Sequence, residues 1–341
     1  MTRWFLAPGS AVLMIAAALL ARAPAIGQTP AATPKTTPAK RAWTPPRTPW
    51  GEPDLRGIWD FATITPMERP KEMAGKEVVS EGEAAEFEKQ TLQRGNADRR
   101  DGGPEADVGR AYNQFWYDRG TKVISTRRTS LIVDPPDGRI PPVTGEAKKR
   151  AAARAEVVRG GPAGPEDRSL WERCILGGNA GPPMAPSAYN NNVQLFQTPG
   201  SVAILNEMIN DTRIVRLDGR PHLPGHIRQW RGDSRGRWDG NTLVVDTTNF
   251  RDETNLRGAA RNLHVVERFT RVAADTLLYE FTVDDPGTWT RPWSAAIPMK
   301  KTEGPIFEYA CHEGNYGMFN MLAGARAQEK AAEESARKES K

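Results

Sequence analysis

Histidines and strand carboxylates are the residues of this sequence whose types and spacing suit proton transfer. The four histidines are His222, His226, His264 and His312. Imidazole titrates near neutral pH, and a neighbouring carboxylate can orient the ring or stabilise its charged form. The catalytic candidates are therefore His264 and His222, with Asp246 and Glu280 as their carboxylate partners. In the competing interpretation these side chains face solvent and pair across strands, as most strand charges do.

The sequence predicts neither a bound metal nor a cofactor. His222 and His226 flank Leu-Pro-Gly, which is turn sequence, so they do not form the helical pair of a zinc site. The chain also has no phosphate loop, dinucleotide fingerprint or serine-nucleophile elbow. These absences argue against nucleotide-dependent chemistry and standard serine hydrolysis.

Arginine and tryptophan crowd into residues 228–238. Guanidinium groups and indole faces suit an anionic or sugar-like ligand, whereas structural Trp–Arg stacking would close the end of a barrel. The ligand-binding candidates are Arg228, Trp230 and Arg237, and Asn191 joins them from the run Asn190-Asn191-Asn192. That run either lines the mouth of a pocket or forms a satisfied turn.

One heptapeptide pattern occurs twice and concerns architecture more than chemistry. The copies are 54-DLRGIWD-60 and 233-DSRGRWD-239, and each opens a stretch with strand character. A Gly-x-Trp at the start of a strand is similar to the first-strand signature of lipocalins, in which the tryptophan closes one end of a barrel. We expect Trp59 and Trp238 to have this structural role.

Short strands separated by turns dominate the chain after residue 185, which predicts a mainly β fold. We expect an antiparallel β-barrel, lipocalin-like, or a sandwich in the C-terminal two-thirds, with a few helices in the N-terminal part. Along 276-TLLYEFTVDD-285, period-2 alternation assigns Leu277, Tyr279, Phe281 and Val283 to the core. The expected strands are 129–133, 193–197, 201–208, 212–217, 242–248, 263–271, 276–283 and 306–311.

The expected organisation is an exported single-domain protein. Arg3 and the apolar run 11–21 predict a signal peptide over residues 1–27, and the run is too short to span a bilayer, which needs about 20 residues. A Pro/Thr/Ala/Lys linker (28–49) precedes one β-rich domain (50–323) with helical insertions at about 80–95 and 144–158. Ser80 and Glu83 have the spacing of a capping box at the start of the first insertion. A polar tail (324–341) follows, and we expect a periplasmic or secreted location with no stable membrane anchor after cleavage.

Cys174 and Cys311 are the only cysteines, and an oxidising compartment favours a disulfide between them. Closing a loop of roughly 140 residues would remove about 5 kcal/mol of unfolded-state entropy on the simplest treatment. Two buried thiols are the alternative. The formal charge is +5, but basic and acidic residues alternate along the chain, so we expect no nucleic-acid partner.

Several long motifs give the chain a family resemblance. They are RTSLIVDPPDG (128–138), AGPPMAPSAYNNN (180–192), RQWRGDSRGRWDG (228–240) and EYACHEGNYG (308–317). Together they resemble a family of uncharacterised exported proteins of environmental bacteria, over about residues 50–330. The resemblance implies export but carries no assigned activity and no catalytic residues.

Three functional hypotheses follow. The first is a barrel domain that binds a small organic ligand, and the second is a cofactor-independent lyase, isomerase or hydrolase that uses a His/carboxylate pair. The third is an interaction protein of the cell envelope. An enzyme predicts convergent His and carboxylate groups in a concave pocket, a binder predicts a pocket with few convergent polar groups, and an interaction protein predicts an exposed aromatic patch.

Overall fold

Alternating side chains along the strands build the interior of a closed barrel. We describe a computed structural model, which covers residues 43–99, 101–109, 113–254 and 256–340. The predicted signal peptide and the linker up to residue 42 lie outside this part, and residues from Trp43 onward belong to one unit. Along the strand Thr276–Asp284, the predicted core residues Leu277, Tyr279, Phe281 and Val283 are all buried, as their parity requires.

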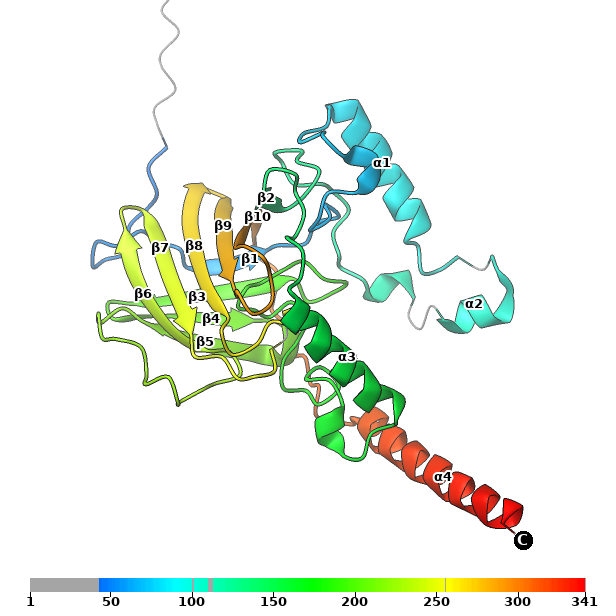
Figure 1. The fold of residues 1–341 in the computed structure, drawn as a ribbon. Helices are drawn as coiled ribbons and strands as arrows, with labels where there is room; N and C mark the ends of the chain where they lie inside the picture. Colours follow the sequence, from blue (N-terminus) through cyan, green and yellow to red (C-terminus); the bar gives the residue numbers. More distant parts are fainter. Residues whose placement is uncertain (1–42, 100, 110–112, 255, 341) are drawn as a thin grey trace, which may run out of the picture. The chain divides into compact units, whose positions relative to one another are not determined.

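The α-helices lie before residue 160 and after residue 315, and most of the strands lie between them in the sequence (Figure 1). The strands are β1 Gly57–Asp60, β2 Ile132–Asp134, β3 Asn192–Thr198, β4 Ser201–Asn206, β5 Asp211–Arg216, β6 Asp233–Asp239, β7 Thr242–Thr248, β8 His264–Ala273, β9 Thr276–Asp284 and β10 Trp293–Thr302. The α-helices are α1 Glu81–Arg94, α2 Gly103–Gly109, α3 Gly145–Arg159 and α4 Tyr316–Glu339. Within the described residues, no helix is both long and apolar enough to cross a membrane.

The sheet closes on itself in the order β1-β3-β4-β5-β6-β7-β8-β9-β10, because β10 also pairs with β1, and β2 adds to β10 outside this ring. The predicted mainly β, barrel-like fold is thus confirmed. The barrel is mixed and not purely antiparallel, since β5 and β6 are parallel neighbours. A parallel pair needs a long connection that returns along the sheet, and here residues 217–232, the crossover segment, provide it.

Two parts of the predicted strand pattern are wrong. Residues 306–311 form no strand, and the Phe307 side chain is exposed to solvent and not packed against the sheet. Conversely, β10 was not predicted, because its sequence WSAAIPMKKT lacks a β-branched alternation and contains Pro298, which disfavours a strand. In the structure Pro298 pairs in register with Leu278 while Ala295, Ile297 and Met299 fill the core.

The two heptapeptides share an ion pair but use their glycines differently. Asp54 pairs with Arg56 at 2.8 Å, and Asp233 pairs with Arg235 at 2.8 Å. Gly57 has a φ of +133°, which side chains rarely adopt, whereas a Cβ on Gly236 would lie 2.7 Å from Val215 of the parallel neighbour β5. In the first motif the glycine permits a backbone conformation that side chains rarely adopt. In the second it leaves room for the close approach of β5 to β6.

Trp59 contributes to the core as the heptapeptide predicted. Its side chain is fully buried, its indole N–H donates to the Leu55 carbonyl at 2.9 Å, and the Arg271 guanidinium lies 5.6 Å from the ring. Trp238 is only partly buried against the same core, and its indole nitrogen has no hydrogen-bond partner among the described residues. Among the described residues, the Arg–Trp contact is therefore particular to the first copy, and closure of a barrel end by these tryptophans stays a prediction.

A charged pair lies inside the barrel among these apolar side chains. The guanidinium of Arg213 on β5 donates to Glu267 on β8, with contacts of 2.5 and 2.9 Å, and both side chains are buried. The Tyr279 hydroxyl on β9 donates to the same carboxylate at 2.8 Å, and the Met184 backbone N–H donates to that hydroxyl at 2.9 Å. Burial, with the Glu267 charge adding to it, raises the pKa of Tyr279 well above its usual value, so the phenol remains a donor.

The helices and the cysteines follow local sequence signals. Ser80 and Glu83 form the predicted capping box of α1, and the Thr144 side chain caps α3. Cys174 and Cys311 form a disulfide with 5.7 Å between their Cα atoms. The predicted polar tail from residue 324 is the C-terminal part of α4.

We predict that Glu267→Gln lowers the free energy of unfolding by about 3–5 kcal/mol, because it leaves the Arg213 charge buried and unpaired. Urea denaturation of the purified domain measures this loss. The matched control is Glu280→Gln on the outer side of β9, which we expect to change stability by less than about 0.5 kcal/mol. Equal effects of the two substitutions would show that the buried pair has no special role.

Candidate functional site

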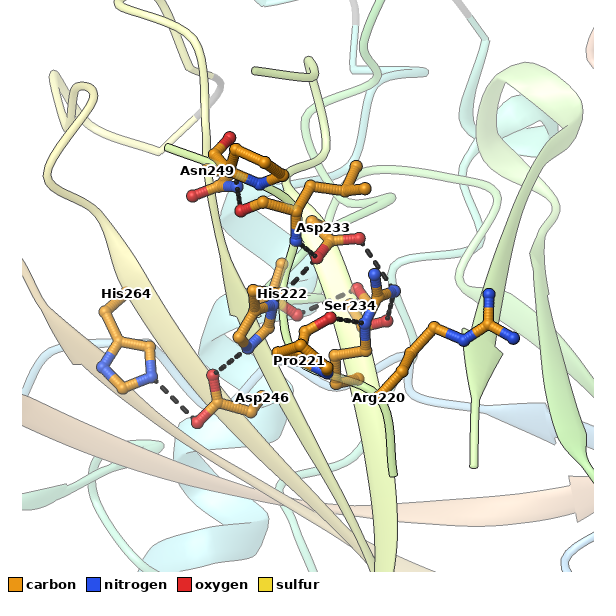
Figure 2. Close-up of polar contacts among 12 residues, drawn as sticks. Arg220, Pro221, His222, Asp233, Ser234, Asp246, Asn249 and His264 are labelled. Atoms are coloured by element: carbon orange, nitrogen blue, oxygen red, sulfur yellow. Dashed lines mark hydrogen bonds and ion pairs between the residues drawn. The ribbon is translucent and has the colours of Figure 1, made fainter. Parts of the chain in front are cut away.

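Three of the predicted catalytic residues come together in one hydrogen-bonded chain (Figure 2). His222 lies between two carboxylates, with Nδ1 3.0 Å from Asp233 Oδ2 and Nε2 3.1 Å from Asp246 Oδ1. His264 approaches the other oxygen of Asp246, with Nε2 3.1 Å from Oδ2. We call Asp233, His222, Asp246 and His264 the wall cluster. His222 therefore links the two carboxylates through its two ring nitrogens.

The wall cluster lies on the outer face of the barrel. On β7, Leu243, Val245 and Thr247 are the buried inward set, so Asp246 projects to the other side. Asp246 is in register with Val266 of β8, which makes His264 its diagonal neighbour on that face.

The crossover segment brings His222 onto the wall. Its backbone is held there at two points, because Asn249 donates to the Leu223 carbonyl at 2.8 Å and Arg235 donates to the Pro221 carbonyl at 3.1 Å. Asp233 also accepts the Leu223 N–H at 3.0 Å. The parallel topology therefore determines the position of His222.

Hydrogen bonding sets the titration of the solvent-facing pair. The hydrogen bond that His264 donates to Asp246 raises the pKa of His264 above its usual value, against the opposing effect of partial burial, and the charges of Asp246 and Asp284 add to the rise. The same contact lowers the pKa of Asp246, and His222 lowers it further. His264 is 40% exposed, so the oriented ring can exchange protons with solvent.

The fourth catalytic candidate lies apart from the wall cluster. Glu280 is on the outer face of β9, in register with Arg268 on β8 and Ala296 on β10. Asp284, not Glu280, is the β9 carboxylate in register with His264. Neither of the two predicted carboxylates points into the barrel, whereas Glu267 of β8 does.

Arg228 and Trp230 line a hollow at the end of the crossover segment. Its other lining residues are Ile175, Gln229, Arg231 and Arg251, and its volume is about 430 Å³. The Arg251 guanidinium lies 4.3 Å from the centre of the Trp230 ring, and that of Arg173 lies 6.0 Å from it. We call this feature the Arg/Trp hollow.

Positive charge exceeds negative charge around the hollow. Arg231 is neutralised by an ion pair with Asp211, whereas the Arg228 guanidinium donates to two neutral acceptors, the carbonyls of Phe250 and Arg261, both at 2.9 Å. Arg251 has no ion-pair partner within the described residues. The nearby Asp252 is paired with Arg261, whose hydrogen bond lowers the pKa of Asp252, and the charges of Arg228 and Arg251 lower it further.

The other two predicted ligand-binding residues do not line this hollow. Arg237 is exposed on the outer face of β6. Asn191 is fully buried, and its amide donates to the Ser187 carbonyl at 3.1 Å and to Asp118 Oδ1 at 3.3 Å. It therefore has the geometry of a satisfied turn, which was the alternative interpretation of the asparagine run.

Arg173, Ile175 and Arg251 are site residues that the sequence did not single out. Arg251 lies eleven residues after the motif RQWRGDSRGRWDG (228–240), so its nearness to this arginine-rich segment was the available signal. Arg173 and Ile175 flank Cys174, and nothing in their local sequence indicates the contact with Trp230.

No group of three or more His, Cys, Asp or Glu side chains is arranged to hold a metal ion in the part of the chain that the structure describes. In the wall cluster, the two imidazoles contact different oxygens of Asp246 and do not converge on a common point. Its chemistry is therefore that of an oriented, exposed His–Asp pair.

Comparison with protein-family models, with curated proteins and with solved structures finds no match to this chain.

The wall cluster predicts a pH-dependent contribution to stability. Because its folded pKa is raised, His264 stabilises the fold fully below its unfolded pKa of 6.5, and this contribution disappears as pH rises through the folded value. The contribution of Asp246, whose pKa is lowered from 3.8, is present above that value and disappears as pH falls through the folded one. The pair therefore contributes most between about pH 4 and pH 6.5.

We predict that His264→Gln lowers the free energy of unfolding by up to about 1 kcal/mol at pH 5.5. The loss is small because solvent screens this exposed pair, and we expect no loss at pH 9, where His264 is uncharged. Urea unfolding at the two pH values measures the difference. His226→Gln is the control, because His226 is an exposed histidine of the crossover segment that is not part of the wall cluster. A loss of equal size at both pH values would contradict the assigned role of the pair.

Proposed function

We propose that this protein is exported and that its barrel domain binds a small organic anion in the Arg/Trp hollow. The observation that carries the proposal is the lining of that hollow, where the Arg251 guanidinium lies over the Trp230 ring and Arg228 adds a second cation, and neither arginine forms an ion pair within the described residues. Guanidinium groups donate in a planar fork that matches a carboxylate or sulfonate, and an indole face accepts a ring.

The size of the hollow suits a ligand of one or two rings. Its volume of about 430 Å³ falls within the range of about 300–1,000 Å³ for small-molecule sites. Ile175 adds an apolar wall, and Gln229 adds a neutral amide. The ligand class we propose is therefore an aryl or similar planar carboxylate, sulfonate or phosphate.

Ligand binding is favoured over catalysis because the convergent acid–base groups and the hollow are separate. The wall cluster provides an oriented His264–Asp246 pair, which is what a lyase, isomerase or hydrolase would need. However, none of its four residues lines the Arg/Trp hollow. A general base outside the substrate site cannot reach the proton that it must remove.

The export part of the proposal rests on two features. The N-terminal sequence has the charge, the short apolar run and the small residues of a signal peptide, and the Cys174–Cys311 disulfide is compatible with an oxidising compartment. The resemblance to exported proteins of environmental bacteria agrees with both.

The test is calorimetric titration of the domain with benzoate, and with benzamide as a neutral molecule of the same shape. We predict that benzoate binds, that benzamide binds at least about tenfold more weakly, and that Arg251→Gln or Arg228→Gln weakens benzoate binding at least about tenfold. The reason is that a hydrogen bond to a charged group contributes about 1.5–3 kcal/mol.

Arg237→Gln is the matched control, because it removes an exposed arginine of β6 that lies outside the hollow. We expect its affinity for benzoate to equal that of the unaltered protein. The proposal is wrong if benzoate and benzamide bind equally, or if Arg237→Gln reduces affinity as much as Arg251→Gln, since general surface charge would then explain the binding.

A further inference from the structure

A second hollow shares lining with the Arg/Trp hollow. Ile175 lines both, and Arg173, which lines the second, places its guanidinium 6.0 Å from the centre of the Trp230 ring in the first. We call it the α4 hollow, because its lining includes the first turn of α4, and its volume is about 460 Å³. Its other lining residues are Pro165, His312, Asn315, Met318 and Phe319. A ligand that extends beyond the Arg/Trp hollow therefore reaches the α4 hollow over Ile175.

Two links hold the walls of the α4 hollow together. Cys174 directly precedes the lining residue Ile175, and its disulfide partner Cys311 lies a few residues before Asn315 on the other wall. The Asn315 amide also donates to the Glu172 carbonyl at 3.0 Å. Because both walls are fixed before a ligand arrives, binding requires less ordering of the protein, which favours affinity.

Two of the three polar side chains that line the α4 hollow are already engaged. The Arg173 guanidinium lies 4.0 Å from the Glu253 carboxylate, so its charge is partly compensated. The Asn315 side-chain oxygen accepts the Met318 N–H at 3.2 Å and caps α4. The Arg/Trp hollow therefore remains the preferred position for an anionic group.

Exposed apolar surface is the main feature of the other lining residues. Phe319 is 71% exposed although it is a large aromatic residue, and Met318 and Ile175 are partly exposed. Pro165 adds a fourth apolar side chain. Covering apolar surface stabilises a complex roughly in proportion to the area removed from water. The α4 hollow therefore suits an alkyl group and not a second charge.

We infer that the two hollows together bind one amphiphilic molecule, an aryl carboxylate or sulfonate that carries an alkyl chain. The inference rests on the proposed function, since the anionic group and the ring occupy the Arg/Trp hollow. The alkyl chain crosses Ile175 and covers Met318 and Phe319. The ligand class is thereby narrowed from small planar anions to alkyl-substituted aryl anions.

Titration of the domain with benzoate and with 4-butylbenzoate tests this inference by calorimetry. We expect 4-butylbenzoate to bind at least about tenfold more tightly than benzoate, because its chain and the surface that it covers both leave water. In Phe319→Ala, we expect this advantage to fall to about threefold or less, because much of the covered surface is removed. The Phe319 side chain is exposed, so its truncation leaves the core unchanged.

Phe307→Ala is the matched control, because Phe307 is a phenylalanine of similar exposure, 66%, that lines neither hollow. We expect it to keep the full advantage of 4-butylbenzoate. Equal binding of the two ligands, an advantage that Phe319→Ala retains, or one that Phe307→Ala also loses would overturn the inference and leave the proposed function standing. If Arg251→Gln weakens neither ligand, the proposed function is wrong and the inference fails with it.

Discussion

The ion pair between Arg213 and Glu267 is the constraint to which the rest of the barrel conforms. Two charges in an apolar interior are tolerated only when their hydrogen-bonding positions are filled, and here they join β5 to β8 through the interior of the barrel. Tyr279 adds β9 to the same carboxylate, and the Met184 N–H, which donates to the Tyr279 hydroxyl, adds the segment that precedes β3. One buried carboxylate therefore organises three strands and one end of the barrel.

The sequence was informative wherever one periodicity or cap determined the outcome. Alternation along 276–283 identified a core strand, and Ser80 with Glu83 identified the start of α1. It failed where a strand has small residues and a proline, as β10 does, because such a strand is stabilised by its neighbours and not by its own propensity. It also failed for residues 306–311, whose apolar side chains find no sheet to pack against.

The residues of the candidate sites were predictable from the sequence, but most of the contacts between them were not. His222, Asp246 and His264 were predictable as residue types, but their meeting on the outer wall depends on the crossover segment, which no local pattern encodes. Arg228 and Trp230 were found because they are close in sequence, whereas Arg173 reaches Trp230 only through the tertiary fold. The α4 hollow is likewise a property of packing, because its walls come from residues far apart in the sequence.

The single parallel pair, β5 with β6, has a consequence for how such a protein can vary. Because these strands run in the same direction, residues 217–232 must travel back along the outside of the barrel, and they carry both His222 and Trp230 on the way. This segment contributes no strand to the closed ring. The length and sequence of residues 217–232 can therefore vary during evolution while the strand registers stay the same. Such variation would change the side chains presented at the wall cluster and at the Arg/Trp hollow without changing the barrel.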